Sequence, residues 1–408
     1  MPLFESIQPA PTDPILGLTE AFRADPNPHK INLSVGVYQD ASGKTPVLES
    51  IRRATQKVVE KLSSKSYLPI PGSPAYAAAV QKLMFGADDE SVASGRVATS
   101  HTPGGTGALR VAADLIHQNM PKATIWMTQP TWPNHPQIFA AAGVPTKSVP
   151  YFDAKTNGLA WDEFLAGVKQ IPAGDVLLLH ACCHNPTGID PTPEQWKQLA
   201  EAITKHGILP LLDFAYQGFA EGIEQDAVGL KTLTRPGSEL IICSSFSKNF
   251  GLYCERVGAL SVVAADKKAV DAVQSQVKAA IRANYSNPPA YGGELVVTVL
   301  NDPELEKLWR SEVDQMRDRI NSMRKLLVET LKAKGAKGEY SFITRQRGIF
   351  SFSGLKPEHV EALKRKHAIY IVGSGRINVA AQATGVARAA LEAALGYARE
   401  RRTMGKAL

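Results

Sequence analysis

Between residues 96 and 281 the chain alternates short apolar runs with longer segments of helical pattern, and this alternation restricts the fold more than any other feature. A strand, a helix and a strand in succession predict a mostly parallel sheet with helices on both faces. The run at 176–179, Val-Leu-Leu-Leu, is continuously apolar, as is typical of a strand buried on both sides. We expect strands at 96–99, 124–127, 144–149, 176–181, 208–212, 240–244 and 257–263, and helices at 107–119, 134–142, 194–206 and 269–281.

The remainder of the chain has a different pattern. A long helix is expected to begin after Asp302-Pro303 and to end near Gly335, because apolar residues recur every three to four positions from 305 to 331. A shorter mixture follows, with strands at 350–352 and 369–372 and helices from about Glu358 and from Val386. The first 15 residues, rich in Pro and without periodicity, are expected to form an extended arm that packs on another part of the assembly, such as a second subunit.

The charge of the chain bears on whether it binds nucleic acid or a membrane. The 408 residues include 46 Lys or Arg and 39 Asp or Glu, which gives a net charge of +7 and a pI of about 9.1. The charges are interleaved, and the densest basic patch, 399–402, is more typical of a solvated helix end than of nucleic-acid or membrane binding. The sequence offers no explanation for the surplus of basic residues.

The sequence also gives expectations about compartment. The N-terminus has no basic segment followed by an apolar one, and no stretch approaches the 18 apolar residues of a membrane span. Four cysteines, including the adjacent pair Cys182-Cys183, form no disulfide framework. We therefore expect a cytoplasmic protein, whose length indicates two or three domains.

Polar and aromatic residues follow the expected strands at the points where the strands end. In an open parallel sheet, ligands bind at the carboxyl ends of the strands. The strand at 96–99 is followed by Gly104-Gly105-Thr106-Gly107, which opens a helix and whose free N–H groups suit a phosphate. This turn fits neither the dinucleotide pattern nor the nucleotide P-loop. The other strand ends supply Trp132, Asn185, Asp213, Tyr216, Ser245 and Lys248.

Each of these residues also has an ordinary structural explanation when it is taken alone. Small residues open many helices, Asp213 could cap a helix, and Lys248 could be a surface lysine. A neighbouring cation such as Arg256 would lower the pKa of Lys248 and let it form a Schiff base. Together, a phosphate turn, a lysine, a carboxylate and a stacking aromatic ring are the parts that a pyridoxal phosphate site requires.

A zinc site is the main rival interpretation of one segment, which contains His180, Cys182, Cys183 and His184. Consecutive residues of an extended strand point to opposite faces, so Cys182 and Cys183 are not expected to share one tetrahedral site. We predict no metal and interpret the segment as a strand end filled by small polarizable side chains. A dinucleotide turn at 373–375 is disfavoured because it lacks a third glycine.

Five longer motifs point to one family: HNPTG at 184–188, DFAYQGF at 213–219, SFSKNFGLYCERVGA at 245–259, IRANYSNPP at 281–289 and SGRINVA at 374–380. Over essentially its whole length the chain resembles the class I aminotransferases of the fold-type I pyridoxal phosphate enzymes, in the aspartate and aromatic aminotransferase subgroup. The resemblance implies an α/β fold, with a mostly parallel central sheet covered by helices in a large domain and a smaller α+β domain. The implied boundaries are an arm at 1–14, a large cofactor domain at 47–312, and a small domain formed by 15–46 and 313–408.

The resemblance also implies that pyridoxal 5'-phosphate is the cofactor. Lys248 would hold it as a Schiff base and shuttle the substrate proton, while Asp213 would pair with the ring nitrogen and have His135 behind it. Trp132 would stack on the ring. The ring hydroxyl would meet Asn185 and Tyr216, and the phosphate would meet Gly105, Thr106, Ser245, Ser247, Arg256 and Tyr67, the last of these from a partner subunit.

The implied reaction is reversible ping-pong transamination between an amino acid and a 2-oxo acid. Arg376 would hold the α-carboxylate through two parallel bonds, which a lysine cannot form. Arg282 from the neighbouring subunit would hold the distal carboxylate of aspartate or glutamate. The active unit would then be a homodimer with no nucleic-acid or membrane partner. The pocket would be framed by Gly36, Trp132, Asn134 and Asn185.

Two substrate preferences are left open by the sequence. Arg282 favours dicarboxylates, but aromatic members of the subgroup keep the same arginine and swing it aside for an apolar ring. The pocket-edge residues resemble the aspartate type, whereas Ser66 and Pro69 resemble aromatic-tolerant members; the pocket-edge residues are Val37, Thr45, Thr106 and Asn287. We expect aspartate:2-oxoglutarate transamination, with aromatic-amino-acid transamination of tyrosine and phenylalanine as the alternative. Departures from the family at Cys254, Tyr291 and Ala381 have no derived effect.

Two alternatives that are not enzymes receive less support. A regulator built on this fold would need an added helix-turn-helix domain, and the length provides no residues for one. An inactive homologue is disfavoured because Lys248, Asp213, Asn185 and Arg376 are all present.

Overall fold

The structure is a computed structural model that describes residues 4–9, 16–61, 63–333, 335, 339–380, 402–403 and 406–407. The last helix expected, from Val386, lies outside the described residues, and so does part of the expected arm. None of the helices described is long and apolar enough to cross a membrane.

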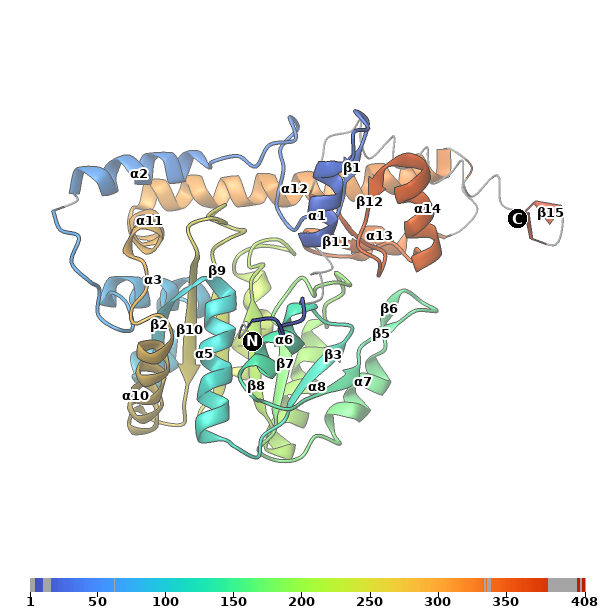
Figure 1. Cartoon of the computed structure of the whole chain (residues 1–408). Helices are drawn as coiled ribbons and strands as arrows, with labels where there is room; N and C mark the ends of the chain where they lie inside the picture. Colours follow the sequence, from blue (N-terminus) through green and yellow to red (C-terminus); the bar gives the residue numbers. More distant parts are fainter. Residues whose placement is uncertain are drawn as a thin grey trace.

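A seven-stranded sheet forms the centre of the molecule (Figure 1). Its strand order is β2-β10-β9-β8-β7-β3-β4. The pairs β9–β8, β8–β7, β7–β3 and β3–β4 are parallel, while β10 runs antiparallel to both of its neighbours. The predicted mostly parallel sheet is confirmed. The strands are β2 Val97–Pro103, β3 Ile125–Gln129, β4 Thr146–Pro150, β7 Val176–His180, β8 Leu209–Phe214, β9 Leu240–Ser245 and β10 Val257–Val263.

The apolar strands are buried on both faces, as their sequence predicts. Along β7, Leu177 and Leu179 belong to one hydrophobic core, and Val176 and Leu178 belong to the other. Side chains of a strand alternate between faces, so a strand between two helical layers has to be apolar at every position. One core contains side chains of α5 Gly104–Asn119, α6 Asn134–Ala141 and α10 Lys267–Asn284; the other contains side chains of α3 Pro74–Phe85, α7 Trp161–Val168, α8 Pro193–His206, α9 Val228–Leu233 and α11 Ala290–Asn301.

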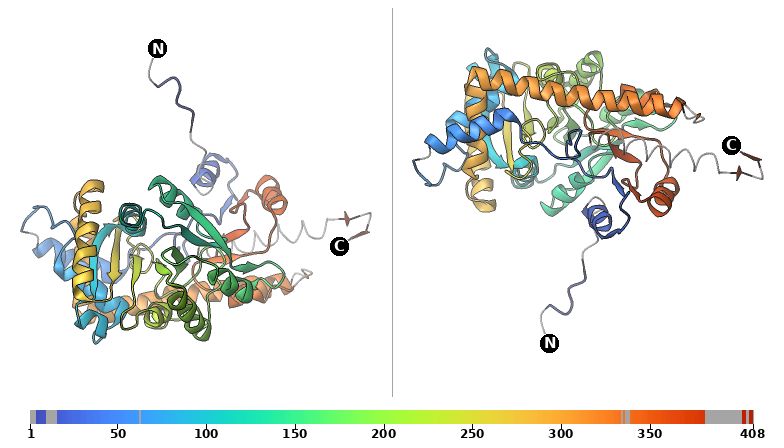
Figure 2. Two further views of the ribbon diagram at one scale, coloured as in Figure 1. Left: turned by 90° about the horizontal axis from the view of Figure 1, so that it is seen from below. Right: turned by 90° about the horizontal axis from the view of Figure 1, so that it is seen from above.

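The long helix predicted after Asp302 is confirmed as α12, Pro303–Ala333. Its apolar stripe, which includes the fully buried Trp309, packs on the sheet domain. Helix α2, Glu49–Lys61, lies alongside it in Figures 1 and 2. The stripe at every third or fourth residue therefore faces the core, as its period requires.

Segments from both ends of the chain meet beyond the sheet. Strand β1, Ile31–Asn32, pairs in parallel with β12, Ile369–Tyr370, and Ile31 packs with Ile369 in a small separate core. Strand β11, Phe350–Phe352, pairs antiparallel with β13, Arg376–Asn378. The remaining elements are α1 Leu16–Ala24, α4 Glu90–Ala93, β5 Phe152–Asp153, β6 Gly158–Leu159, the 3-10 helix Gln225–Ala227, α13 Phe342–Arg345, α14 Pro357–His367, β14 Arg402–Thr403 and β15 Lys406–Ala407.

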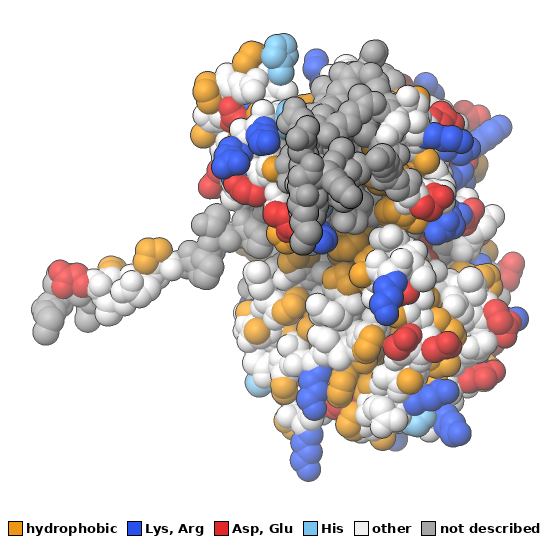
Figure 3. All heavy atoms as spheres, turned by 90° about the vertical axis from the view of Figure 1, so that its right-hand side faces the viewer, with side chains coloured by type: hydrophobic (Ala, Val, Ile, Leu, Met, Phe, Trp, Pro, Cys, Tyr) orange, Lys and Arg blue, Asp and Glu red, His pale blue; other side chains and the backbone are white. Residues whose placement is uncertain are grey.

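Basic and acidic side chains are mixed on the surface. The face shown in Figure 3 carries Lys and Arg side chains interspersed with Asp and Glu, and they form no continuous basic stripe there. This mixed pattern matches the interleaving of charges along the sequence.

Candidate active site

The candidate site lies at the carboxyl ends of the parallel strands. Asp213 is near the end of β8, and Asn185 and Lys248 lie in the loops that follow β7 and β9. Trp132 lies in the loop between β3 and α6. Because β3, β7, β8 and β9 are adjacent and parallel, their ends meet on one edge of the sheet.

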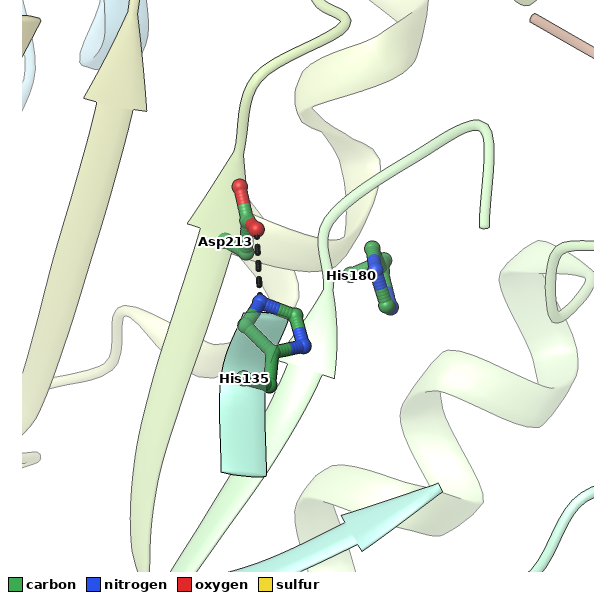
Figure 4. A group of neighbouring side chains, drawn as sticks. All are labelled: His135, His180 and Asp213. Atoms are coloured by element: carbon green, nitrogen blue, oxygen red, sulfur yellow. Dashed lines mark hydrogen bonds and ion pairs between the residues drawn. The ribbon is translucent and has the colours of Figure 1, made fainter. Parts of the chain in front are cut away.

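Asp213 forms a buried pair with His135. The Nε2 atom of His135, a fully buried residue at the start of α6, lies 2.9 Å from Oδ2 of Asp213 (Figure 4). Its Nδ1 atom lies 2.8 Å from the Thr131 hydroxyl. A carboxylate can only accept, so Nε2–H donates to Asp213, and Nδ1 accepts from the Thr131 hydroxyl. The sequence predicted His135 here, but it gave no signal for Thr131.

The carboxyl group of Asp213 stays ionised inside the protein. Burial by itself raises the pKa of Asp213, but the hydrogen bond from His135, helped by the positive charge of Lys248, outweighs burial and lowers that pKa below its usual value. Figure 4 shows His180 beside the pair. Burial lowers the pKa of His180 to about 3, so this neighbour is neutral at physiological pH. Asp213 is therefore a fixed negative charge at the end of β8.

Lys248 lies beside Tyr216 and has a lowered pKa. Its Nζ atom lies 4.6 Å from the centre of the Tyr216 ring. Burial lowers the pKa of Lys248 to about 8; Asp213 opposes this shift and Arg256 adds to it. A lysine with this pKa has roughly 300 times more neutral amine at pH 7 than an ordinary lysine, and nucleophilic chemistry requires the neutral amine. The contribution of Arg256 agrees with the expectation drawn from the sequence.

An anion cradle forms where α5 begins beside the ends of β9 and β10. A Cβ atom added at Gly104 would lie 2.5 Å from Nη2 of Arg256, and one added at Gly105 would lie 3.1 Å from Cβ of Ser245. Gly104 also has a φ of 74°, which favours glycine. The Ser245 hydroxyl donates to the Ser247 hydroxyl at 3.1 Å. The exposed Thr106 is in the first turn of α5. These groups surround a helix N-terminus that suits a phosphate.

Arg376 reaches the same edge of the sheet from β13. It is 3% exposed, and it donates to Oδ1 of Asn185 at 3.3 Å and to the Ser34 carbonyl at 3.0 Å. Its guanidinium lies 4.0 Å from the centre of the Phe350 ring. A Cβ atom at Gly36 would lie 3.1 Å from Cζ of the same ring, which places Gly36 beside Phe350 in this cluster. The sequence predicted Arg376, Asn185 and Gly36 but missed Phe350, whose apolar side chain gave no signal.

Arg282 and Tyr67 are not buried in this cluster. Tyr67 is 90% exposed, and Arg282 is an exposed residue in the last turn of α10 that donates to the Ser286 hydroxyl next to it. Asn134 is the first residue of α6, directly before His135. The structure thus brings the other predicted residues to one edge of the sheet and leaves Arg282 and Tyr67 on the surface of the single chain.

Cys182 and Cys183 do not point to opposite faces of a strand, as the sequence had led us to expect. Cys183 has a φ of 52°, so the chain turns there and does not continue as a strand. The two thiols and a carboxylate oxygen of Asp226 consequently lie within 4.8 Å of one another. The ligand atoms of His135, His180 and Asp213 form a second such group. Burial raises the pKa of both cysteine thiols, which keeps them protonated.

The residues present fit a pyridoxal phosphate group. The buried Nε of Arg376 and both ring nitrogens of His180 have no hydrogen-bond partner among the described residues. A buried donor without a partner costs roughly 1–3 kcal/mol, so Arg376 is arranged for an acceptor from a ligand. A phosphate cradle, a lysine with a lowered pKa and an ionised buried carboxylate complete the set of groups that such a cofactor needs.

Fold and site together define an α/β enzyme with an anion cradle, a lysine of lowered pKa and a buried arginine at the strand ends. Residues 28–393 match the family described as aminotransferase class I and II. The chain belongs to this family.

Individual relatives agree in length as well as in sequence. The aspartate aminotransferase of Salmonella typhi is 52% identical over 93% of this chain and 96% of its own length. The aromatic-amino-acid aminotransferase of Pseudomonas aeruginosa is 45% identical over 92% of this chain and 94% of its own. A similar solved structure is the crystal structure of an aromatic-amino-acid aminotransferase from Burkholderia pseudomallei covalently bound to pyridoxal phosphate. It is 47% identical to this chain, with a TM-score of 0.94, and the match covers 97% of this chain and 99% of that chain.

Proposed function

We propose that this protein catalyses reversible transamination between L-aspartate and 2-oxoglutarate with pyridoxal 5'-phosphate as its cofactor. The observation that carries the proposal is the ionised, buried Asp213 close to a lysine, Lys248, whose pKa is about 8. A buried carboxylate costs free energy unless a positive partner compensates it. The protonated ring nitrogen of the cofactor is such a partner.

Named residues would hold each part of the cofactor. Asp213 would face the ring nitrogen and Trp132 the ring, while Asn185 and Tyr216 would bond the ring hydroxyl oxygen. The phosphate would lie at the start of α5, among Gly105, Thr106, Ser245, Ser247 and Arg256, with Tyr67 of the partner subunit. When bound, the cofactor supplies an electron-accepting ring next to the substrate Cα.

The chain's own residues perform the remaining steps. Arg376 binds the α-carboxylate of the substrate through parallel N–H bonds and so fixes the orientation of Cα. Nζ of Lys248 takes the proton from Cα as a neutral amine and returns it in the reverse direction. His135, held by Thr131, keeps the Asp213 carboxylate oriented and ionised.

Substrate choice depends on a second subunit in this proposal. Arg282 is exposed at the end of α10 and would reach the distal carboxylate of a substrate bound in the partner, which makes the active unit a homodimer. We further propose a cytoplasmic location, an arm at 1–14, a large domain at 47–312 and a small domain formed by 15–46 and 313–408. The pairing of β1 with β12 supports a small domain made from both ends of the chain.

Aromatic-amino-acid transamination is the second candidate. It is supported by the similarity to the Burkholderia pseudomallei structure, at 47% identity. Aspartate is preferred because the aspartate aminotransferase of Salmonella typhi is more similar, at 52% identity.

Steady-state kinetics with the cofactor-loaded enzyme test the proposal. We expect kcat/KM with 2-oxoglutarate to be larger for aspartate than for phenylalanine or tyrosine, and a preference of about tenfold or more for the aromatic substrates would reverse the assignment. Lys248→Ala should still bind the cofactor but fail to turn over. Substantial steady-state activity in that variant would remove Lys248 from its proposed role.

A further inference from the structure

Arg324 is a buried cation whose hydrogen-bond partners among the described residues are all neutral. It lies in the C-terminal half of α12, is 1% exposed, and forms no ion pair with any carboxylate of the described residues. Burial lowers the pKa of Arg324 to about 10, so it remains charged at neutral pH. An isolated buried charge is costly, which means that its neutral partners must compensate for the loss of water.

Its partners are backbone and side-chain oxygens of the segment 348–351 and of α12. Nη2 donates to the Phe350 carbonyl at 2.8 Å and also to the Gly348 carbonyl. Nε donates to the Ser351 hydroxyl at 3.2 Å, and Nη1 donates to Oδ1 of Asn321 at 3.0 Å. Three of the four acceptors lie between residues 348 and 351, so this one guanidinium fixes the start of β11 to α12.

The segment that Arg324 fixes supports Arg376. Phe350 of this segment has its ring 4.0 Å from the Arg376 guanidinium and 6.2 Å from the Tyr216 ring. Strand β11 also pairs directly with β13, with Phe352 opposite Arg376. On its other side the segment meets the loop that carries Asn185, since a Cβ at Gly348 would lie 2.5 Å from Cβ of Cys183.

We propose that Arg324 is a positioning residue for substrate binding: it holds the Gly348–Phe350 backbone and thereby keeps the Phe350 ring against Arg376, which sets the guanidinium for the α-carboxylate. The inference rests on the proposed function insofar as Arg376 is the carboxylate site. It extends that function to a residue on the long helix that itself touches neither substrate nor cofactor.

Arginine has a specific advantage in this position. Its planar guanidinium has five N–H donors in a fixed fork, and here it reaches four acceptors in different directions. A lysine keeps the charge but has one nitrogen, which cannot reach carbonyls on both sides of Ile349 and the two side chains. Arg324→Lys is therefore a conservative variant that loosens β11 and leaves the buried charge.

The test compares Arg324→Lys with Phe350→Leu and with a control, Arg317→Lys. Arg317 is on the same helix but pairs with Asp314 of that helix. Each cofactor-loaded enzyme is assayed for KM and kcat with aspartate and with phenylalanine. Two further measurements need no turnover: the dissociation constant of maleate, a dicarboxylate without amino or oxo groups, by calorimetry, and the melting temperature.

We expect Arg324→Lys to raise the KM of both amino acids and the maleate dissociation constant by about 5- to 20-fold, with kcat changed by less than about threefold. The effect should be similar for both amino acids, because both carry the α-carboxylate. Phe350→Leu should give the same pattern, and the double variant should be no worse than about the larger single effect, since both act through one contact. Arg317→Lys should leave all of these constants unchanged.

Other outcomes overturn the inference. A lower melting temperature with unchanged maleate affinity would make Arg324 purely structural, and so would additive effects in the double variant. If the unaltered enzyme binds maleate but does not transaminate, the proposed function is refuted. The maleate dissociation constants of the variants would still decide the role of Arg324 in that case. If the unaltered enzyme does not bind maleate, Arg376 is not a carboxylate-binding residue, and the inference about Arg324 fails as well.

Discussion

Replacing Arg376 with lysine is the sharpest test of the substrate site. The guanidinium is almost fully buried, rests on the Phe350 ring, and uses Nη1 and Nη2 for Asn185 and the Ser34 carbonyl. Its Nε remains without a partner among the described residues. Lysine keeps the positive charge in the pocket but cannot offer two parallel N–H groups to one carboxylate.

The size of the effect follows from the bond that is lost. A hydrogen bond to a charged group contributes about 1.5–3 kcal/mol. At about 1.36 kcal/mol per factor of ten, loss of one of two parallel bonds lowers kcat/KM by about 13- to 160-fold. Poorer stacking of the ammonium on Phe350 adds to this loss, because a desolvated cation–π contact contributes about 2 kcal/mol or more.

The assay is kcat/KM of the cofactor-loaded Arg376→Lys enzyme for aspartate and for phenylalanine. Both substrates present the same α-carboxylate, so both should lose activity by a similar factor. Arg317→Lys, the control on α12, should stay within about twofold of the unaltered enzyme. A loss below about threefold for both substrates, with the cofactor bound, would refute the assignment of Arg376 as the α-carboxylate ligand.

Three further predictions concern other residues. Arg282→Ala should lower kcat/KM for aspartate by about 100-fold or more but affect phenylalanine little, since only aspartate has a distal carboxylate, and equal losses would exclude that role. In the cofactor-free protein, labelling of Lys248 by an amine-reactive reagent should rise with pH around a midpoint of about 8, because only the neutral amine reacts and burial lowers the pKa of Lys248 from 10.5. A midpoint near 10 would contradict the burial of this side chain. Gly258→Ala should lower the free energy of unfolding, measured by chemical denaturation, by about 1–3 kcal/mol, since its Cβ would lie 2.4 Å from the carbonyl carbon of Gly104. Gly373→Ala is the matched control, because a Cβ at Gly373 would have no neighbour within 4 Å.

Much of the sheet could be predicted from local pattern. The run at 176–179 is apolar at every position because each of its side chains enters one of two cores. The direction of β10 could not be predicted in this way. Its sequence is as apolar as that of its parallel neighbours, and its antiparallel direction results from the path of the chain through the loop that contains Lys248 and Arg256.

The candidate site was predictable where charged and polar residues follow several buried strands and so gather at one edge of the sheet. A lysine and an aspartate at the ends of buried strands are conspicuous because burial is costly for both. Phe350, Thr131 and Arg324 were not predictable, since an apolar ring, a hydroxyl and an arginine on an amphipathic helix are ordinary in sequence. They gain their importance only from contacts with residues far away in the chain.

The sequence by itself therefore determined the α/β class of this protein, its long helix and the groups at the strand ends, because these depend on periodicity within a few residues. Only the tertiary structure decided that Cys183 turns the chain so that two thiols meet, that Asp213 stays ionised through His135, and that Arg324 holds the strand beneath Arg376. Such features depend on the burial of charges and on hydrogen bonds between distant segments, and local sequence carries no record of either.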